Sequence, residues 1–286
     1  MRVVERLPPL QPSTLAKLFG VGATVGPVVD SLHNQCLLRY EYAPIVIPSP
    51  FDDSAPLLAS SWAVPPLLGF AYVVLGAVLP RLVQWIIINF RSKITLSNND
   101  SFLIATSTTT SSLTTNNQLR TKAIMAVLST AAIIKLSEYL EVVHPLPSSV
   151  AQVGVLLLLA LSQWALLDGT TAALWAASVT SMGGPLSELP FVAHHMWEYL
   201  PHAGDYFPLA GLSSSNNNNL QPVLTSLLGD DYASLALSSI TGPCYFAVTM
   251  DAIALGRWFD GAAEEEGGLE AAAADIMAND VRRSAS

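Results

Sequence analysis

Charge is scarce in this chain of 286 residues, because only 12% of its residues are Asp, Glu, Lys or Arg. Soluble proteins carry about 25%. Hydrophobic residues make up 51% of the chain, and the mean hydropathy is +0.44. A soluble domain of this length would lack the charged side chains that normally cover its surface. The composition excludes a soluble enzyme and predicts an integral membrane protein.

Cysteine and clustered basic residues are scarce as well. Cys36 and Cys244 are too few for a disulfide framework or a four-cysteine zinc site. The formal net charge is −9, from 13 Lys and Arg against 22 Asp and Glu, whereas nucleic-acid binding calls for a basic patch. The common hydrolase, metalloprotease and nucleotide-binding motifs are also absent from the sequence. We therefore expect no nucleic-acid partner. Because no motif pairs the Ser and His residues, we expect no catalytic residues, metal or cofactor, and an intramembrane hydrolase stays open as an alternative.

Long apolar runs are abundant. A helix that crosses a bilayer needs about 20 mostly apolar residues, and six stretches qualify, near 16–32, 57–79, 123–140, 149–167, 171–192 and 234–256. The run 82–90 is too short to cross, and its Trp85 and flanking Arg81 and Arg91 predict an interfacial helix. The expected fold class is all-α, a polytopic membrane bundle of six transmembrane helices.

The positions of Lys and Arg predict the orientation of this bundle. The segment before the first span, the segment between the second and third, and the segment after the sixth hold 10 of the 13 basic residues. The opposite side has Arg39 alone. Because basic residues concentrate in cytosolic loops, both termini should be cytosolic.

This topology divides the chain into a membrane domain and its attached segments. Residues 92–119 are rich in Ser, Thr and Asn and predict a cytosolic insertion without a packed core. Asn99 begins a glycosylation sequon there, which we expect to stay unmodified on the cytosolic side. The predicted segments are a cytosolic N-terminus at 1–15, a membrane domain at 16–257, a lumenal loop at 196–232 and an acidic cytosolic tail at 258–286.

Ionisable side chains inside predicted spans are costly and are candidates for function. Three of them lie near span ends, where a side chain that snorkels to the membrane surface costs little free energy: Lys17, Asp30 and Glu188. Lys135 and Glu138 are three positions apart on one helical face and are expected to pair. Asp251 is interpreted as an interfacial acid. A small transporter or channel that uses Lys135, Glu138 and Asp251 remains the alternative.

A histidine cluster raises a second alternative. His194, Glu198 and His202 are four apart, which would align them on a helix as zinc ligands. Pro201 restricts the backbone just before His202, so an interfacial cluster beside Trp197 is the preferred interpretation. A metal-dependent membrane enzyme stays open as the other.

The most distinctive run is SSWAVPPLLG at 60–69. Pro65 and Pro66 inside a span would free backbone carbonyls and kink the helix. Gly69 and Gly76 lie seven apart, nearly on one face, and permit close helix packing. The run predicts either a kinked packing helix or a kink that opens a lipid-sized cavity.

This run resembles the second span of the insulin-induced gene (Insig) family of endoplasmic reticulum membrane proteins. The matching residues are Ser60, Trp62, Val64, Pro65, Pro66, Gly69, Gly76 and Pro80. Shorter matches in the other spans are Leu18-Phe19-x-Val21-Gly22, Trp164 with Asp168, Pro243-Cys244 and Gly256-Arg257. The chain departs from the family at Ala63, where the family has a second Trp, and at 169–171, where family members have basic residues.

The resemblance implies a six-span, non-enzymatic regulator of the endoplasmic reticulum membrane. Such proteins bind a sterol, notably an oxysterol, or a diacylglycerol-like lipid within the bundle. They associate with sterol-sensing-domain proteins, namely an escort protein and HMG-CoA reductase, and a homo-oligomer is compatible with this. The resemblance implies a partner-binding role for Asp168. The residues that we expect to line the sterol or lipid cavity are Trp62, Pro65, Pro66, Gly69 and Trp164.

Overall fold

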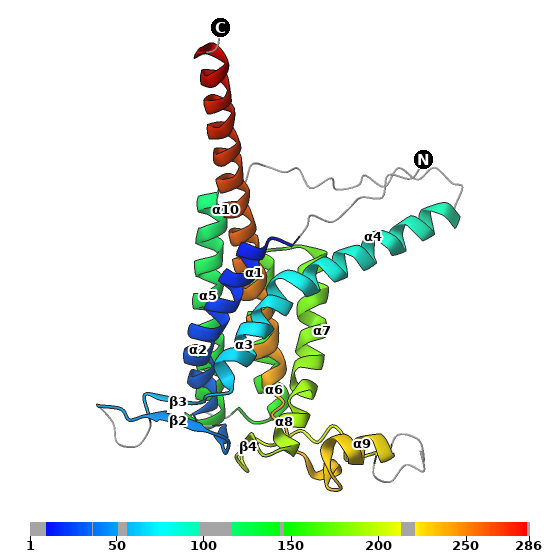
Figure 1. The fold of residues 1–286 in the computed structure, drawn as a ribbon. Coiled ribbons are helices and arrows are strands. Elements are labelled where there is room, and N and C mark those ends of the chain that lie inside the picture. Colours follow the sequence, from blue (N-terminus) through cyan, green and yellow to red (C-terminus); the bar gives the residue numbers. More distant parts are fainter. Residues whose placement is uncertain are drawn as a thin grey trace.

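The computed structural model describes residues 10–35, 37–50, 56–97, 116–143, 146–212 and 221–284, and of 91–97 and 264–284 only the backbone. The protein is a bundle of long helices with small β elements at one end (Figure 1). The predicted mostly helical fold is confirmed. Residues 98–115 of the predicted Ser/Thr/Asn insertion, with Asn99 among them, lie outside the described residues, and so do residues 1–9 of the N-terminus.

The helices follow one another along the chain with few interruptions. They are α1 (Pro12–Thr24), α2 (Gly26–Asn34), α3 (Val64–Val73), the π-helical segment η1 (Val74–Val78), α4 (Leu79–Ser97), α5 (Asn116–Glu138), the π-helical segment η2 (Tyr139–Val143), α6 (Ser149–Leu167), α7 (Thr171–Ser187), α8 (Leu189–Ala193), α9 (Gln221–Leu228), the 3₁₀ segment η3 (Tyr232–Ser234) and α10 (Thr241–Ser284).

Two antiparallel strand pairs were not foreseen in an all-α prediction. β1 (Leu38–Tyr40) pairs with β4 (Trp197–Tyr199), and β2 (Pro44–Ile47) pairs with β3 (Leu58–Ser61). Each strand has only three or four residues, too few for alternation to mark it in the sequence. The β1–β4 pair joins the segment after α2 to the segment after α8 and caps one end of the bundle (Figure 1).

Among the described residues, four helical segments are long and apolar enough to cross a membrane: 12–34, 64–90, 116–143 and 149–167. α7 has 17 residues, and α10 contains Asp251 and Arg257 within its apolar part. The six-span prediction is therefore supported in part. The predicted interfacial helix at 82–90 continues α3 and η1 without a break and leans away from the bundle as α4 (Figure 1).

Several predicted boundaries are wrong for identifiable reasons. The second span begins at Val64 rather than near 57, because residues 58–61 form β3. Pro65 and Pro66 open α3 in its first turn, where the missing N–H costs no intrahelical bond, so they do not kink the span. The fifth span ends at Ser187, and α8 follows with Pro190 in its first turn. The tail after 257 continues α10 to Ser284.

α10 is the central helix of the bundle. Its buried side chains include Phe246, Met250 and Ile253, which pack against the inner faces of α5, α6 and α7. At one end, Asp260 accepts hydrogen bonds from Thr14 of α1 at 2.8 Å and from Arg81 of α4 at 2.6 Å. This network places the start of α1, the start of α4 and the end of the apolar part of α10 at the same end of the bundle.

Candidate functional site

A pocket opens between helices at the end of the bundle that carries the β strands. The space between its walls, counted out into the open mouth, is about 820 Å³. Most of its lining surface is apolar. Its apolar walls come from α2, β1, α3, α5 and α10: Val29, Leu38, Val64, Leu67, Leu68, Ile134 and Val248.

One polar group of the pocket is centred on Asp30 of α2. Tyr40 of β1 donates a hydrogen bond from its hydroxyl to Asp30 Oδ2 at 2.7 Å. Asn34, one turn further along α2, donates from Nδ2 to the Tyr40 oxygen at 2.9 Å. Burial and the nearby Asp30 raise the pKa of Tyr40 well above its ordinary value. The phenol therefore stays protonated and remains a donor to the carboxylate.

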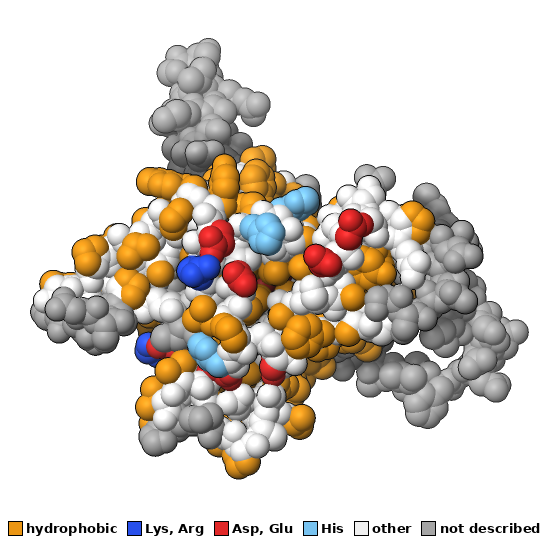
Figure 2. Space-filling view, turned by 90° about the horizontal axis from the view of Figure 1, so that it is seen from below, with side chains coloured by type: hydrophobic (Ala, Val, Ile, Leu, Met, Phe, Trp, Pro, Cys, Tyr) orange, Lys and Arg blue, Asp and Glu red, His pale blue; other side chains and the backbone are white. Residues whose placement is uncertain are grey.

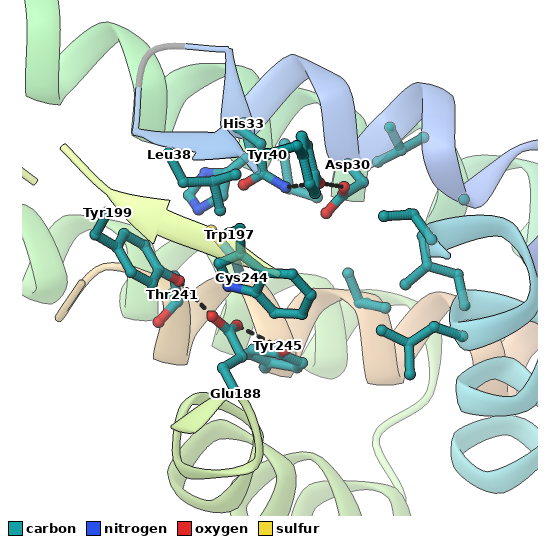
Figure 3. Close-up of a pocket in the computed structure, with 18 of the residues that line it drawn as sticks. Asp30, His33, Leu38, Tyr40, Glu188, Trp197, Tyr199, Thr241, Cys244 and Tyr245 are labelled. Carbon is teal, nitrogen blue, oxygen red and sulfur yellow. Dashed lines mark hydrogen bonds between the residues drawn. The ribbon is translucent and has the colours of Figure 1, made fainter. Parts of the chain in front are cut away.

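A second polar group is centred on Glu188, at the junction of α7 and α8. Tyr199 of β4 donates to Glu188 Oε2 at 2.5 Å, and Tyr245 of α10 donates to Oε1 at 2.7 Å. Burial and the adjacent Glu188 raise the pKa of Tyr199 well above its ordinary value. Figure 3 shows Asp30 and Glu188 on opposite sides of the pocket, each with its tyrosine partners.

The expectation that Asp30 and Glu188 snorkel to the membrane surface is wrong. Glu188 is buried and Asp30 is half-buried, and both line the pocket. The reason is that strands β1 and β4 fold over this end of the bundle and bring Tyr40 and Tyr199 to the two carboxyl groups. Two acids near span ends without basic neighbours were the available sequence signal, but their partners lie on strands that the sequence did not reveal.

The predicted cavity residues of the second span lie outside this pocket. Trp62 precedes α3 and is 72% exposed. Pro65 and Pro66 lie in the first turn of α3, and Gly69 packs against the ring of Phe19. None of these four predicted residues is among those that line the pocket. Their contact with a lipid stays a prediction.

Trp164 and Asp168 lie together at the end of α6, away from the pocket lining. Trp164 donates from Nε1 to the Thr170 carbonyl at 3.0 Å. Asp168 accepts from the Thr170 backbone N–H at 2.8 Å and forms an ion pair with Arg257 of α10. Only 5% of the Asp168 side chain is exposed, so this carboxylate holds α6, the α6–α7 turn and α10 together.

Replacing Asp168 by Asn should destabilise the bundle by about 1 kcal/mol. The amide can still accept from Thr170, but it loses the charge that attracts Arg257, whose partly exposed guanidinium is screened by solvent. Thermal unfolding of Asp168→Asn, Arg257→Gln and the double variant in detergent measures this coupling. Strictly additive losses would show that the pair contributes nothing.

The structure shows where the residues of the two alternative functions, a transport path and a metal centre, lie. Lys135 and Glu138 form the predicted ion pair, with Lys135 56% exposed. Asp251 is buried and accepts from Tyr72 at 3.3 Å, so its interfacial interpretation is wrong. None of Lys135, Glu138 and Asp251 is among the residues that line the pocket described above. Across the described ranges, no group of three His, Cys, Asp or Glu side chains could hold a metal ion.

The histidine spacing fails because the expected helix does not form. His194 follows the last residue of α8, whereas Glu198 lies in strand β4 and His202 in the following turn. The neighbouring Trp197 is buried and stacks on Phe191 at 4.9 Å. Figure 2 shows histidine and acidic side chains together on the surface at this end of the molecule, and an interfacial role for the histidines stays a prediction.

Comparison with known proteins identifies relatives of this fold. The sequence model of the insulin-induced protein (INSIG) family matches residues 13–259. A crystal structure of MvINS, a mycobacterial Insig homolog from Mycobacterium vanbaalenii, is similar with a TM-score of 0.53 and 15% identity, over 89% of this chain and 97% of that chain. A crystal structure of a cross-linked MvINS trimer gives 0.54 and 16% over the same shares. No curated protein sequence matches significantly.

Proposed function

The chain belongs to the insulin-induced protein (INSIG) family, and from this premise we propose that it is a non-enzymatic lipid-responsive regulator of the endoplasmic reticulum membrane. It binds a sterol or a diacylglycerol-like lipid and associates with sterol-sensing-domain proteins, such as an escort protein or HMG-CoA reductase. The observation that carries this proposal is the pocket between the helices, with apolar walls, the buried carboxyl group of Glu188 and the half-buried one of Asp30.

The shape and chemistry of the pocket support a lipid ligand. Its apolar walls come from α2, β1, α3, α5 and α10, and the outer faces of α2 and α3 carry the exposed Val28 and Phe70. A ligand in this pocket would place its apolar body against Val29, Leu67 and neighbouring side chains. An apolar site with a few polar groups orients a ligand by those groups, so the polar group of the lipid would lie between Asp30 and Glu188.

We also propose six membrane spans with both termini in the cytosol. The four apolar segments leave α7 and the apolar part of α10 as the remaining spans, and 17 residues for α7 lies within the usual range of about 17–25. The contacts of Thr14, Arg81 and Asp260 bring together the starts of α1 and α4 and the end of the apolar part of α10, and the basic segments adjoin these points in the sequence. Arg39 pairs with Glu41 and Glu198 at the other. The positive-inside rule makes the first end cytosolic.

Sterol-dependent association tests the regulatory role. The protein should co-purify with a sterol-sensing-domain protein more strongly when an oxysterol is added, because a ligand shifts association only by its different affinity for the free and bound states. If Asp168 also contacts the partner, Asp168→Asn should weaken association beyond its effect on stability. Association that responds neither to sterol nor to Asp168→Asn would contradict this function.

The pocket itself can be tested by filling it. Val29→Trp should weaken lipid binding by about tenfold or more, because Val29 is 8% exposed and lines the pocket, so an indole there occupies the space of the ligand. The matched control is Val28→Trp, since the adjacent Val28 is 52% exposed. Equal lipid binding by the two variants, measured with a radiolabelled sterol and a radiolabelled diacylglycerol, would place the ligand elsewhere.

Self-association is the remaining part of the proposal. The MvINS trimer, with a similar fold, supports an oligomer of this chain. Chemical cross-linking in native membranes should give a discrete oligomer, whereas a single monomer band at complete cross-linker coverage would contradict it.

A further inference from the structure

The β2–β3 hairpin presents apolar side chains to its surroundings. Val46 of β2 is 63% exposed and Leu57, directly before β3, is 60% exposed, while Tyr42 and Ile47 are exposed as well. Successive side chains of a strand point to opposite faces of its sheet, so Val46 and Ile47 make both faces of the hairpin apolar. Exposed apolar patches mark contacts with another protein or with a membrane.

The hydroxyl side chains of the hairpin are buried instead. Ser60 and Ser61 of β3 are both buried, and the stretches 42–50 and 56–63 contain no Asp, Glu, Lys or Arg. An antiparallel sheet that borders water turns its polar side chains outward. This hairpin has the reverse pattern, with hydroxyls inside and aliphatic side chains outside, which is typical of a surface that faces lipid.

Hydrogen bonds fix the hairpin to the helix bundle. The backbone N–H of Ala59 in β3 donates to Ser31 Oγ of α2 at 2.9 Å. At the other end of β3, the backbone N–H of Trp62 donates to the Ala43 carbonyl at 3.1 Å. The exposed side chains are therefore held in a fixed position relative to the helices, and that position decides what they contact.

The hairpin leads directly into a membrane span. β3 ends at Ser61, and α3 begins at Val64, the first residue of the apolar segment 64–90. Trp62 lies between them and is 72% exposed, and tryptophan is enriched where a span meets the membrane surface. Figure 1 shows the β2–β3 pair extending sideways from the bundle, across the direction of α2 and α3. In a membrane, the hairpin therefore extends along the bilayer surface.

We propose that the β2–β3 hairpin and Trp62 lie in the headgroup region of the lumenal leaflet, with Val46 and Leu57 against phospholipid. The sheet has two strands, so the outer backbone edge of β2 needs water or headgroups as hydrogen-bond partners and excludes the hydrocarbon core. This inference rests on the proposed membrane spans and orientation. The segment 51–55, which contains Asp52 and Asp53, lies outside the described residues, and the contact is assigned to the strands and Trp62.

Site-specific photo-crosslinking tests the contact with lipid. The photoreactive residue p-benzoylphenylalanine replaces Val46, Leu57 or Glu198 in the full chain, which is reconstituted in phosphatidylcholine nanodiscs and illuminated. Mass spectrometry then measures the lipid adduct. The Val46 and Leu57 variants should each give at least about fivefold more adduct than the Glu198 variant, because interfacial side chains are surrounded by lipid. Glu198 of β4 is the matched control, since its side chain is 65% exposed at the same end of the bundle.

A fourth position, Phe70, separates this proposal from the membrane assignment itself. Phe70 is 65% exposed on α3, inside the apolar segment 64–90, and should cross-link to lipid in either case. Adduct at Phe70 but not at Val46 or Leu57 would reject the hairpin contact and leave the membrane span standing. Equal adduct at Val46, Leu57 and Glu198 would contradict a contact specific to the hairpin. Absence of adduct at all four positions would reject the span together with this inference.

Discussion

Replacing Gly256 by Ala is expected to separate α10 from η1 and to lower the free energy of unfolding by about 3 kcal/mol. A Cβ at Gly256 would lie 2.3 Å from the Gly76 carbonyl oxygen, and one at Gly76 would lie 2.4 Å from the Ala252 oxygen. Both obstacles are backbone atoms of tightly packed helices. They cannot rotate away as a side chain would, so the two helices must move apart along their contact.

A glycine in open space provides the control for this prediction. Gly154 lies inside α6, and a Cβ there would meet nothing within 4 Å. Gly154→Ala should therefore be neutral or raise stability by up to about 1 kcal/mol, from helix propensity alone. The free energies of unfolding of Gly256→Ala and Gly154→Ala, measured in the same detergent, are compared. Equal stability would show that the α10–η1 contact is not as close as the structure has it.

Replacing Glu188 by Leu is expected to cost a similar amount, about 2–5 kcal/mol, by a different mechanism. The variant removes the acceptor of both Tyr199 and Tyr245 and leaves two phenolic hydroxyls without their partners. An orphaned buried hydroxyl costs about 1–3 kcal/mol. Glu188→Gln should cost less, because its amide oxygen still accepts one hydrogen bond.

The origin of this cost can be separated from lost packing. In the Glu188→Leu background, Tyr199→Phe removes one orphaned hydroxyl and should recover about 1 kcal/mol or more, whereas in the native background Tyr199→Phe should be destabilising. The double-mutant cycle is measured by thermal unfolding of the native protein, Glu188→Leu, Tyr199→Phe and the double variant. The same sign of the Tyr199→Phe effect in both backgrounds would contradict the hydrogen-bonding account.

Much of the fold was predictable because long apolar runs in a sequence indicate membrane-spanning helices. The runs at 123–140 and 149–167 fall within helical segments that the structure makes long and apolar enough to cross a membrane. The Gly76 match also had a physical meaning, since that glycine is where η1 and α10 touch. Helix starts were less predictable. Pro65 and Pro66 are equally compatible with a kink and with a first turn, and only the strand before them decides between the two.

The pocket was not predictable, because its polar groups are assembled by non-local contacts. Leu38 pairs with Tyr199 across about half of the chain, and this short ladder brings Tyr199 to Glu188. Asp30 and Glu188 looked like ordinary span-end acids when each was considered with its sequence neighbours. Trp62 was conspicuous in the sequence because of its motif, yet it is 72% exposed and lies outside the pocket.

The central claim, that this helix bundle holds a lipid in its pocket, is tested most directly by identifying the lipid that co-purifies with the protein. Native mass spectrometry of gently purified protein should show a sterol or a diacylglycerol-like lipid, retained by Val28→Trp and absent from Val29→Trp. A protein that carries no lipid, or that retains an anionic phospholipid equally in both variants, would contradict the account.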